Sequence, residues 1–115
     1  MKFNTNLYKL SLFSEEVCED CQHLKHLLKE NNISFSDKCI TKGSETNNNN
    51  RWDFIDAERE NNGLNWFTPV LIIEDSEGNT TYIPSVQDTV NCDDGECLNN
   101  ITLDNVKTVL KPYLV

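Results

Sequence analysis

Apolar residues recur along this chain with two different periods, and these periods separate the expected strands from the expected helices. Short apolar or alternating runs, which are typical of strands, lie at residues 7–13, 33–39, 70–73 and 80–83. Apolar spacings of three and four, which favour one buried helix face, lie at residues 18–31, 51–61 and from Thr102 or Asp104 onward. The pattern therefore predicts the order strand, helix, strand, helix, strand, strand, helix.

Polar segments between these elements predict turns and loops. Residues 42–50 end in an unbroken run of asparagine and are expected to form a solvated loop before the second helix. Residues 76–79 predict the turn of a β-hairpin, and the acidic segment 87–100 predicts a loop. Pro112 ends or kinks the last helix. Because no repeat or linker divides the chain, we expect one domain over residues 1–115.

The charge of the chain excludes some classes of partner. The formal net charge is -9, which argues against a surface for nucleic acid or for anionic lipid. A partner with a basic docking patch stays compatible with this charge. The sequence shows no signal peptide and no run of about 20 apolar residues that could span a bilayer. We therefore expect a cytoplasmic, monomeric protein without a membrane or nucleic-acid partner.

The most informative motif is Cys18-Glu19-Asp20-Cys21, which lies at the junction between the first expected strand and the first expected helix. In a reducing cytosol, cysteines are more often catalytic or metal-binding than structural. The free N–H groups and the dipole at a helix N-terminus favour a thiolate, the form that attacks disulfides. Cys18 is therefore expected to be the exposed nucleophile. Cys21 shares a face with Leu24 and Leu28, so it is expected to be a partly buried resolving thiol.

A second candidate element is Thr68-Pro69, directly before the most apolar run of the chain. Proline lacks an N–H group and occurs at the start or the edge of a strand. One interpretation is a strand start only. The other is a cis-proline that faces the cysteine pair and leaves the backbone of Thr68 to pair with an extended peptide substrate.

Taken together, the strand at residues 8–13, Cys18 with Cys21, Thr68-Pro69-Val70 and the following hairpin resemble a glutaredoxin over residues 7–84. The resemblance implies a thioredoxin-like α/β fold, with a four-stranded mixed sheet flanked by three helices. It implies reduction of protein disulfides or glutathione-mixed disulfides, with no bound cofactor and with glutathione as a co-substrate. Small glutaredoxins often donate electrons to ribonucleotide reductase, which makes that enzyme a candidate partner. Glutathione and a thioredoxin reductase are the candidate electron sources.

The chain departs from the usual glutaredoxin motif in its charge. Glu19-Asp20 replaces the usual Pro-Tyr, and Glu15 and Glu16 stand where a lysine for the glutathione carboxylate is usual. Lys42 and Arg51 are candidate replacement cations, although both are also typical of a solvated surface. Negative charge disfavours a thiolate, so these carboxylates predict a more reducing cysteine pair.

The remaining cysteines leave two alternatives open. Cys92 and Cys97 are expected to be an accessory dithiol or free thiols, and no bound metal is expected. The alternative is a structural zinc site that they form with Cys18 and Cys21. A third hypothesis is a thioredoxin-like interaction domain whose cysteines have lost turnover. Cys39 is expected to be a packing residue.

The aromatic and histidine residues beside the two motifs have ordinary explanations. Trp66 and Phe67 precede Thr68 and could form either core or a platform beside the substrate. His23 and His26 lie off the apolar helix face, so both are expected to be exposed to solvent.

Overall fold

The computed structural model describes residues 1–61, 66–85, 97–98 and 100–115. Its elements are β1 (Tyr8–Ser14), α1 (Glu19–Glu30), β2 (Ser36–Cys39), α2 (Glu45–Glu60), β3 (Phe67–Asp75), β4 (Thr80–Ser85), α3 (Leu103–Leu110) and the 3₁₀ helix η2 (Lys111–Tyr113). The strand order in the sheet is β2-β1-β3-β4. β1 is parallel to β2 and antiparallel to β3, and β3 is antiparallel to β4. The predicted α/β class, with a four-stranded mixed sheet and three α-helices, is confirmed for these residues.

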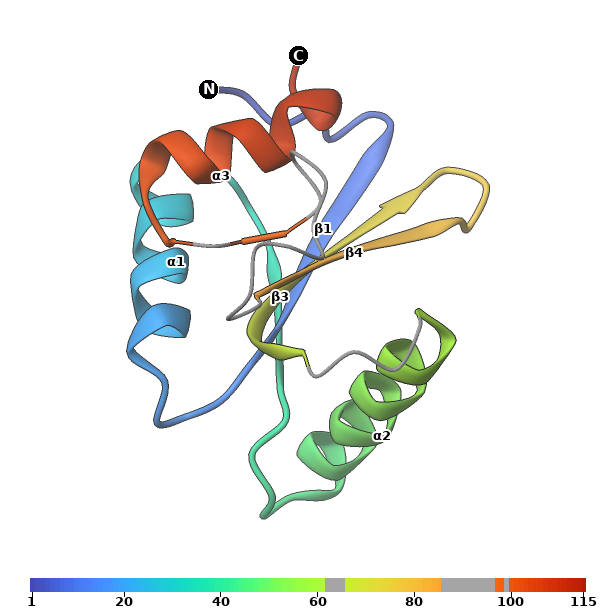
Figure 1. The fold of residues 1–115 in the computed structure, drawn as a ribbon. Helices are drawn as coiled ribbons and strands as arrows, with labels where there is room; N and C mark the ends of the chain where they lie inside the picture. Colours follow the sequence, from blue (N-terminus) through green and yellow to red (C-terminus); the bar gives the residue numbers. More distant parts are fainter. Residues whose placement is uncertain (62–65, 86–96, 99) are drawn as a thin grey trace.

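Helices cover both faces of this sheet (Figure 1). α1 and α3 lie side by side on one face, and α2 lies on the other. Successive side chains of a strand point to opposite faces, so Leu12 packs with α1 and α3 while Phe13 packs with α2. The same alternation sends Ile73 to the first face and Ile72 to the second. Because both faces of β3 are covered, residues 70–73 of this strand form a continuous apolar run.

The second strand is shorter than the sequence pattern predicts. Asn32 has a positive φ of 57°, and the N–H of Ile33 donates to the carbonyl of Leu28 at 2.9 Å. These residues therefore end α1 by capping its last carbonyls. Ile33 is buried in the core beside α1, although it lies outside β2 (Ser36–Cys39). An apolar residue that closes a helix looks the same in the sequence as the start of a strand.

The prediction of a loop at residues 42–50 is wrong for its second half. α2 begins at Glu45, and Ser44 is its N-cap, with its hydroxyl accepting the N–H of Asn47 at 3.1 Å. The amide of Asn50 donates to the carbonyl of Cys39 at 3.1 Å and so ties α2 to the end of β2. Asparagine is a weak helix former, yet its intrinsic preference is small beside packing and capping. The missed signal was Ser44 followed by the acidic Glu45.

The β3–β4 hairpin forms where the sequence predicts it. The carboxylate of Asp75 accepts the backbone N–H groups of Glu77 and Asn79, both at 2.9 Å. These donors, that of Asn79 first, lower the pKa of the Asp75 carboxyl. At the other end of the hairpin, the hydroxyl of Ser85 donates to the carbonyl of Pro69 at 2.7 Å. This bond fixes the start of β3, which lies beside the cysteine pair.

In the part of the chain that the structure describes, no helix has both the length and the apolar character needed to cross a membrane.

Candidate active site

Cys18 stands at the junction between β1 and α1, as the sequence predicts. It is the N-cap of α1, with extended backbone angles, and its Sγ accepts the backbone N–H of Cys21 at 3.1 Å. Cys18 and Cys21 are joined by a disulfide bond. In the reduced protein the same N–H group would stabilise negative charge on Cys18. The local fold thus supplies the thiolate-stabilising contact that was expected from a helix N-terminus.

The two sulfur-bearing residues differ in their exposure to solvent. Cys21 is completely buried against the same face as Leu24 and Leu28, whereas Cys18 is partly exposed. A molecule in solution can therefore approach Cys18 but not Cys21. This arrangement suits an attacking thiol at position 18 and a resolving thiol at position 21.

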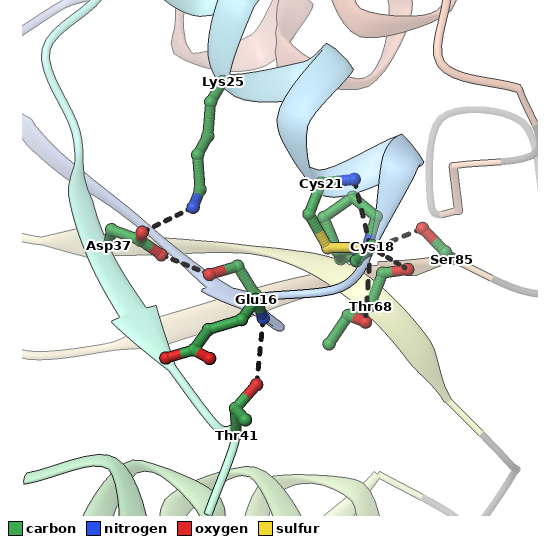
Figure 2. The surroundings of a disulfide bond; sticks show 10 residues. Glu16, Cys18, Cys21, Lys25, Asp37, Thr41, Thr68 and Ser85 are labelled. Carbon is green, nitrogen blue, oxygen red and sulfur yellow. Dashed lines mark hydrogen bonds and ion pairs between the residues drawn. A yellow bond between two sulfur atoms is a disulfide. The ribbon is translucent and has the colours of Figure 1, made fainter. Parts of the chain in front are cut away.

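The start of β3 faces the cysteine pair (Figure 2). The Thr68–Pro69 peptide bond is cis, as one interpretation of the sequence predicts. The hydroxyl of Thr68 donates to Cys18 Sγ at 3.7 Å, and the carbonyl oxygen of Thr68 lies 3.9 Å from the same sulfur. Pro69 is buried, so the backbone of Thr68 is held beside Cys18 Sγ.

A polar chain connects the end of β1 with β2 and α1. The buried hydroxyl of Ser14 donates to the carboxylate of Asp37, whose other oxygen lies 2.6 Å from the ammonium of Lys25. Lys25 is thus already paired with a carboxylate. It therefore contributes little positive charge to Cys18.

A groove of about 220 Å³ lies between the start of β3 and the middle of α2. Its apolar lining includes Ile55, Trp66 and Phe67, and its charged lining consists of Glu15 and Arg51. Thr68 lines this groove and also contacts Cys18, so the groove opens beside the disulfide. Trp66 is buried among Phe54 and Tyr82, which makes it a core residue. Phe67 is 44% exposed and lines the groove, and its role as a platform stays a prediction.

Carboxylates surround the junction that carries Cys18. Glu16, Glu19 and Asp20 are exposed, and Glu15 is partly exposed. The backbone N–H of Glu16 donates to the hydroxyl of Thr41 at 2.9 Å, which holds this acidic turn against the end of β2. The candidate cations Lys42 and Arg51 are exposed and partly exposed, respectively, and only Arg51 lines the groove.

The zinc alternative requires four thiolate sulfurs. The sulfurs of Cys18 and Cys21 are bonded to each other, Cys97 is also disulfide-bonded, and Cys92 lies outside the described residues. Among the residues that are described, no group of three or more His, Cys, Asp or Glu side chains is arranged to hold a metal ion. Zinc binding by the reduced protein stays an alternative, which metal analysis of the purified protein tests.

The remaining candidates are unconnected with this site. Cys39 is a half-buried free thiol at the end of β2. His23 and His26 are exposed, as expected, and His26 pairs with Glu30 at 2.7 Å along α1. Sequence reasoning missed the polar supports Ser14, Asp37 and Ser85. Only Ser14 carried a signal, as a small polar residue at the end of an apolar run.

This chain matches no family model, no curated protein and no solved structure.

Proposed function

We propose that this protein is a thiol–disulfide oxidoreductase that reduces disulfides through the dithiol of Cys18 and Cys21. The observation that carries the proposal is the asymmetry of this pair at the N-terminus of α1. Cys18 is partly exposed and accepts an N–H bond, while Cys21 is completely buried. A disulfide with only a structural role does not require that a substrate can reach Cys18 Sγ. It also does not require the contacts between Thr68 and this sulfur.

The arrangement of elements supports a thioredoxin-like fold of the glutaredoxin kind. The sheet order β2-β1-β3-β4, with α1 and α3 on one face and α2 on the other, resembles that fold. The cis peptide bond before Pro69, opposite the cysteine pair, is a further point of resemblance. Fold alone does not fix function, so this likeness is secondary to the site.

The reaction follows from the positions of the two sulfurs. The Cys18 thiolate attacks one sulfur of a substrate disulfide, a mixed disulfide forms, and the other substrate sulfur leaves as a thiolate that takes up a proton. The Cys21 thiolate then attacks Cys18 Sγ, which forms the Cys18–Cys21 disulfide and releases the second substrate thiol. Two electrons pass from the protein dithiol to the substrate. Glutathione or a thioredoxin reductase would restore the dithiol, and ribonucleotide reductase is a candidate substrate by resemblance.

The proposal is tested with pre-reduced protein and a peptide disulfide. We expect the protein to form the Cys18–Cys21 disulfide while two equivalents of peptide thiol appear, as measured by mass spectrometry after acid quenching. Cys18→Ser should abolish the reaction. Cys21→Ser should trap a mixed disulfide with the peptide on Cys18, since the resolving thiol is missing. Cys39→Ser is the matched control and should react at the rate of the parent protein.

Two outcomes would contradict this assignment. Trapping by Cys18→Ser rather than by Cys21→Ser would reverse the roles of the two cysteines. A parent protein that binds peptide disulfides without releasing thiols would favour an interaction domain without turnover.

A further inference from the structure

Large apolar side chains lie exposed beside the reactive sulfur. Val17, the residue before Cys18, is 96% exposed, and Phe67, the residue before Thr68, is 44% exposed. Both residues flank the contact between Thr68 and Cys18 Sγ, although they are 50 positions apart in the sequence. The other large exposed hydrophobics of the described residues are Leu7, Trp52 and Val115. Exposed apolar surface beside a reactive group is typical of a docking site.

The groove next to Cys18 extends this apolar surface inward. Phe67 and Ile55 line it, and its volume of about 220 Å³ is enough for one apolar side chain of a substrate. The backbone of Thr68 borders the same groove, so a substrate segment that enters it passes close to Cys18.

The charge around this apolar surface is negative. Glu15, Glu16, Glu19 and Asp20 lie around the turn that carries Cys18, in a protein whose net charge is -9. Arg51 is the cation of the groove lining, and Glu15 lines the same groove. Like charges repel, so this rim disfavours an anionic substrate and favours a cationic one.

We infer that the substrates of this site are protein disulfides whose cysteine is flanked by an apolar residue and by lysine or arginine. This inference rests on the proposed function and names the class of substrate for the same site. The apolar neighbour of the substrate cysteine packs against Val17, Phe67 and the groove. The basic neighbour is attracted to the carboxylates around Cys18. Glutathione, a small anionic peptide, lacks both features.

The test compares disulfide-linked peptide dimers that differ at two positions. One position beside the cysteine is Leu or Ser, and the other is Lys or Glu. The measured quantity is the second-order rate constant for oxidation of the pre-reduced protein. It is divided by the rate constant for the same peptide with dithiothreitol, which removes differences in peptide reactivity. We expect the Lys peptides to react about tenfold faster than the Glu peptides at low salt. This ratio should approach one at high salt, since salt screens exposed charges.

Matched variants separate the two features. The double change Glu19→Gln with Asp20→Asn should lower the Lys/Glu ratio several-fold. Glu74→Gln with Glu77→Gln removes the same charge at the opposite end of β3 and should leave the ratio unchanged. A change in the reduction potential of the cysteine pair affects both rate constants alike, because both peptides react with the same variant. It therefore cancels in the ratio.

The apolar feature has its own pair of variants. Val17→Ser and Phe67→Ser should slow the Leu peptides several-fold and leave the Ser peptides nearly unaffected. Leu7→Ser alters a side chain that is 51% exposed, outside the groove and before the start of β1, and should change neither rate.

The outcomes distinguish this inference from the function on which it rests. Equal rates for all four peptides, each abolished by Cys18→Ser, would overturn the inference and leave the oxidoreductase function standing. Faster reaction of the Glu peptides would assign the groove to an anionic substrate held by Arg51. If no peptide oxidises the Cys18–Cys21 dithiol, both proposals fail.

Discussion

At the scale of single residues, the balance of charge on Cys18 decides how reducing the pair is. The N–H of Cys21 favours the thiolate, and the carboxylates of Glu19 and Asp20 in the same helical turn disfavour it. Lys25, the nearby cation on α1, is 2.6 Å from Asp37 and thus already neutralised. A less stabilised thiolate makes the dithiol a stronger electron donor.

We therefore predict a reduction potential below the glutaredoxin range of about -200 to -230 mV, toward about -270 mV, the value of thioredoxin. The double change Glu19→Gln with Asp20→Asn should make the potential less negative, because it removes charge without changing side-chain shape. A shift of 30 mV corresponds to about 1.4 kcal/mol, which several partly screened charges can supply. Equilibration with glutathione buffers measures it. If the neutral variant is equally or more reducing, turn geometry rather than charge sets the potential.

At the scale of elements, α2 shows how a cap defines a helix that composition disfavours. Its first two turns hold an asparagine run, yet Ser44 satisfies the N–H of Asn47, and Phe54 and Ala57 pack the later turns against the sheet. Helices in proteins are stabilised more by packing of one face than by intrinsic preference. α2 also supplies Arg51 and Ile55 to the groove, so its stability bears on the site.

We predict that Ser44→Ala destabilises the protein by about 1 kcal/mol, since it removes the acceptor for the N–H of Asn47. Thr46→Ala is the matched control, because Thr46 is exposed inside the helix and alanine is the better helix former. It should leave the free energy of unfolding unchanged or raise it slightly. Urea denaturation of both variants measures the difference. Equal effects of the two changes would show that the Ser44 cap contributes nothing to α2.

At the scale of the whole molecule, the sheet separates two apolar layers. The layer under α1 and α3 contains Ile73 and Ile83, and the layer under α2 contains Ile40. The cysteine pair lies at the N-terminus of α1, which covers the first layer. The groove borders the second layer, under α2. The site therefore lies where both layers meet the same end of the sheet.

This arrangement predicts which core substitutions act independently. Ile40→Val and Ile73→Val should each cost about 0.5–1.5 kcal/mol and add within about 0.5 kcal/mol, because they lie on opposite faces of the sheet. Ile73→Val with Ile83→Val should depart from additivity, because both residues pack in one layer on adjacent strands. Urea denaturation of the single and double variants measures the changes in the free energy of unfolding that test additivity for both pairs. Strong coupling of Ile40 with Ile73 would contradict two separate layers.

The sequence by itself determined the features that depend on local spacing. The apolar runs located β1, β3 and β4, and the three-and-four spacing placed Cys21 on the buried face of α1. It also placed Cys18 at a helix N-terminus and Thr68-Pro69 at the start of a central strand. These features follow from the two periods of strand and helix, which each segment carries without reference to the rest of the chain.

Only the tertiary structure decided which distant residues meet. Thr68 touches Cys18 because the register of β1 with β3 brings Phe13 opposite Val70. Asp37 reaches Ser14 and Lys25 because β2 lies parallel to β1, and Ser85 holds Pro69 because β4 folds back on β3. A periodic pattern gives the face of each element but not its neighbour, since pairing depends on the packing of all elements at once. The groove and the supports of the cysteine pair are products of that packing.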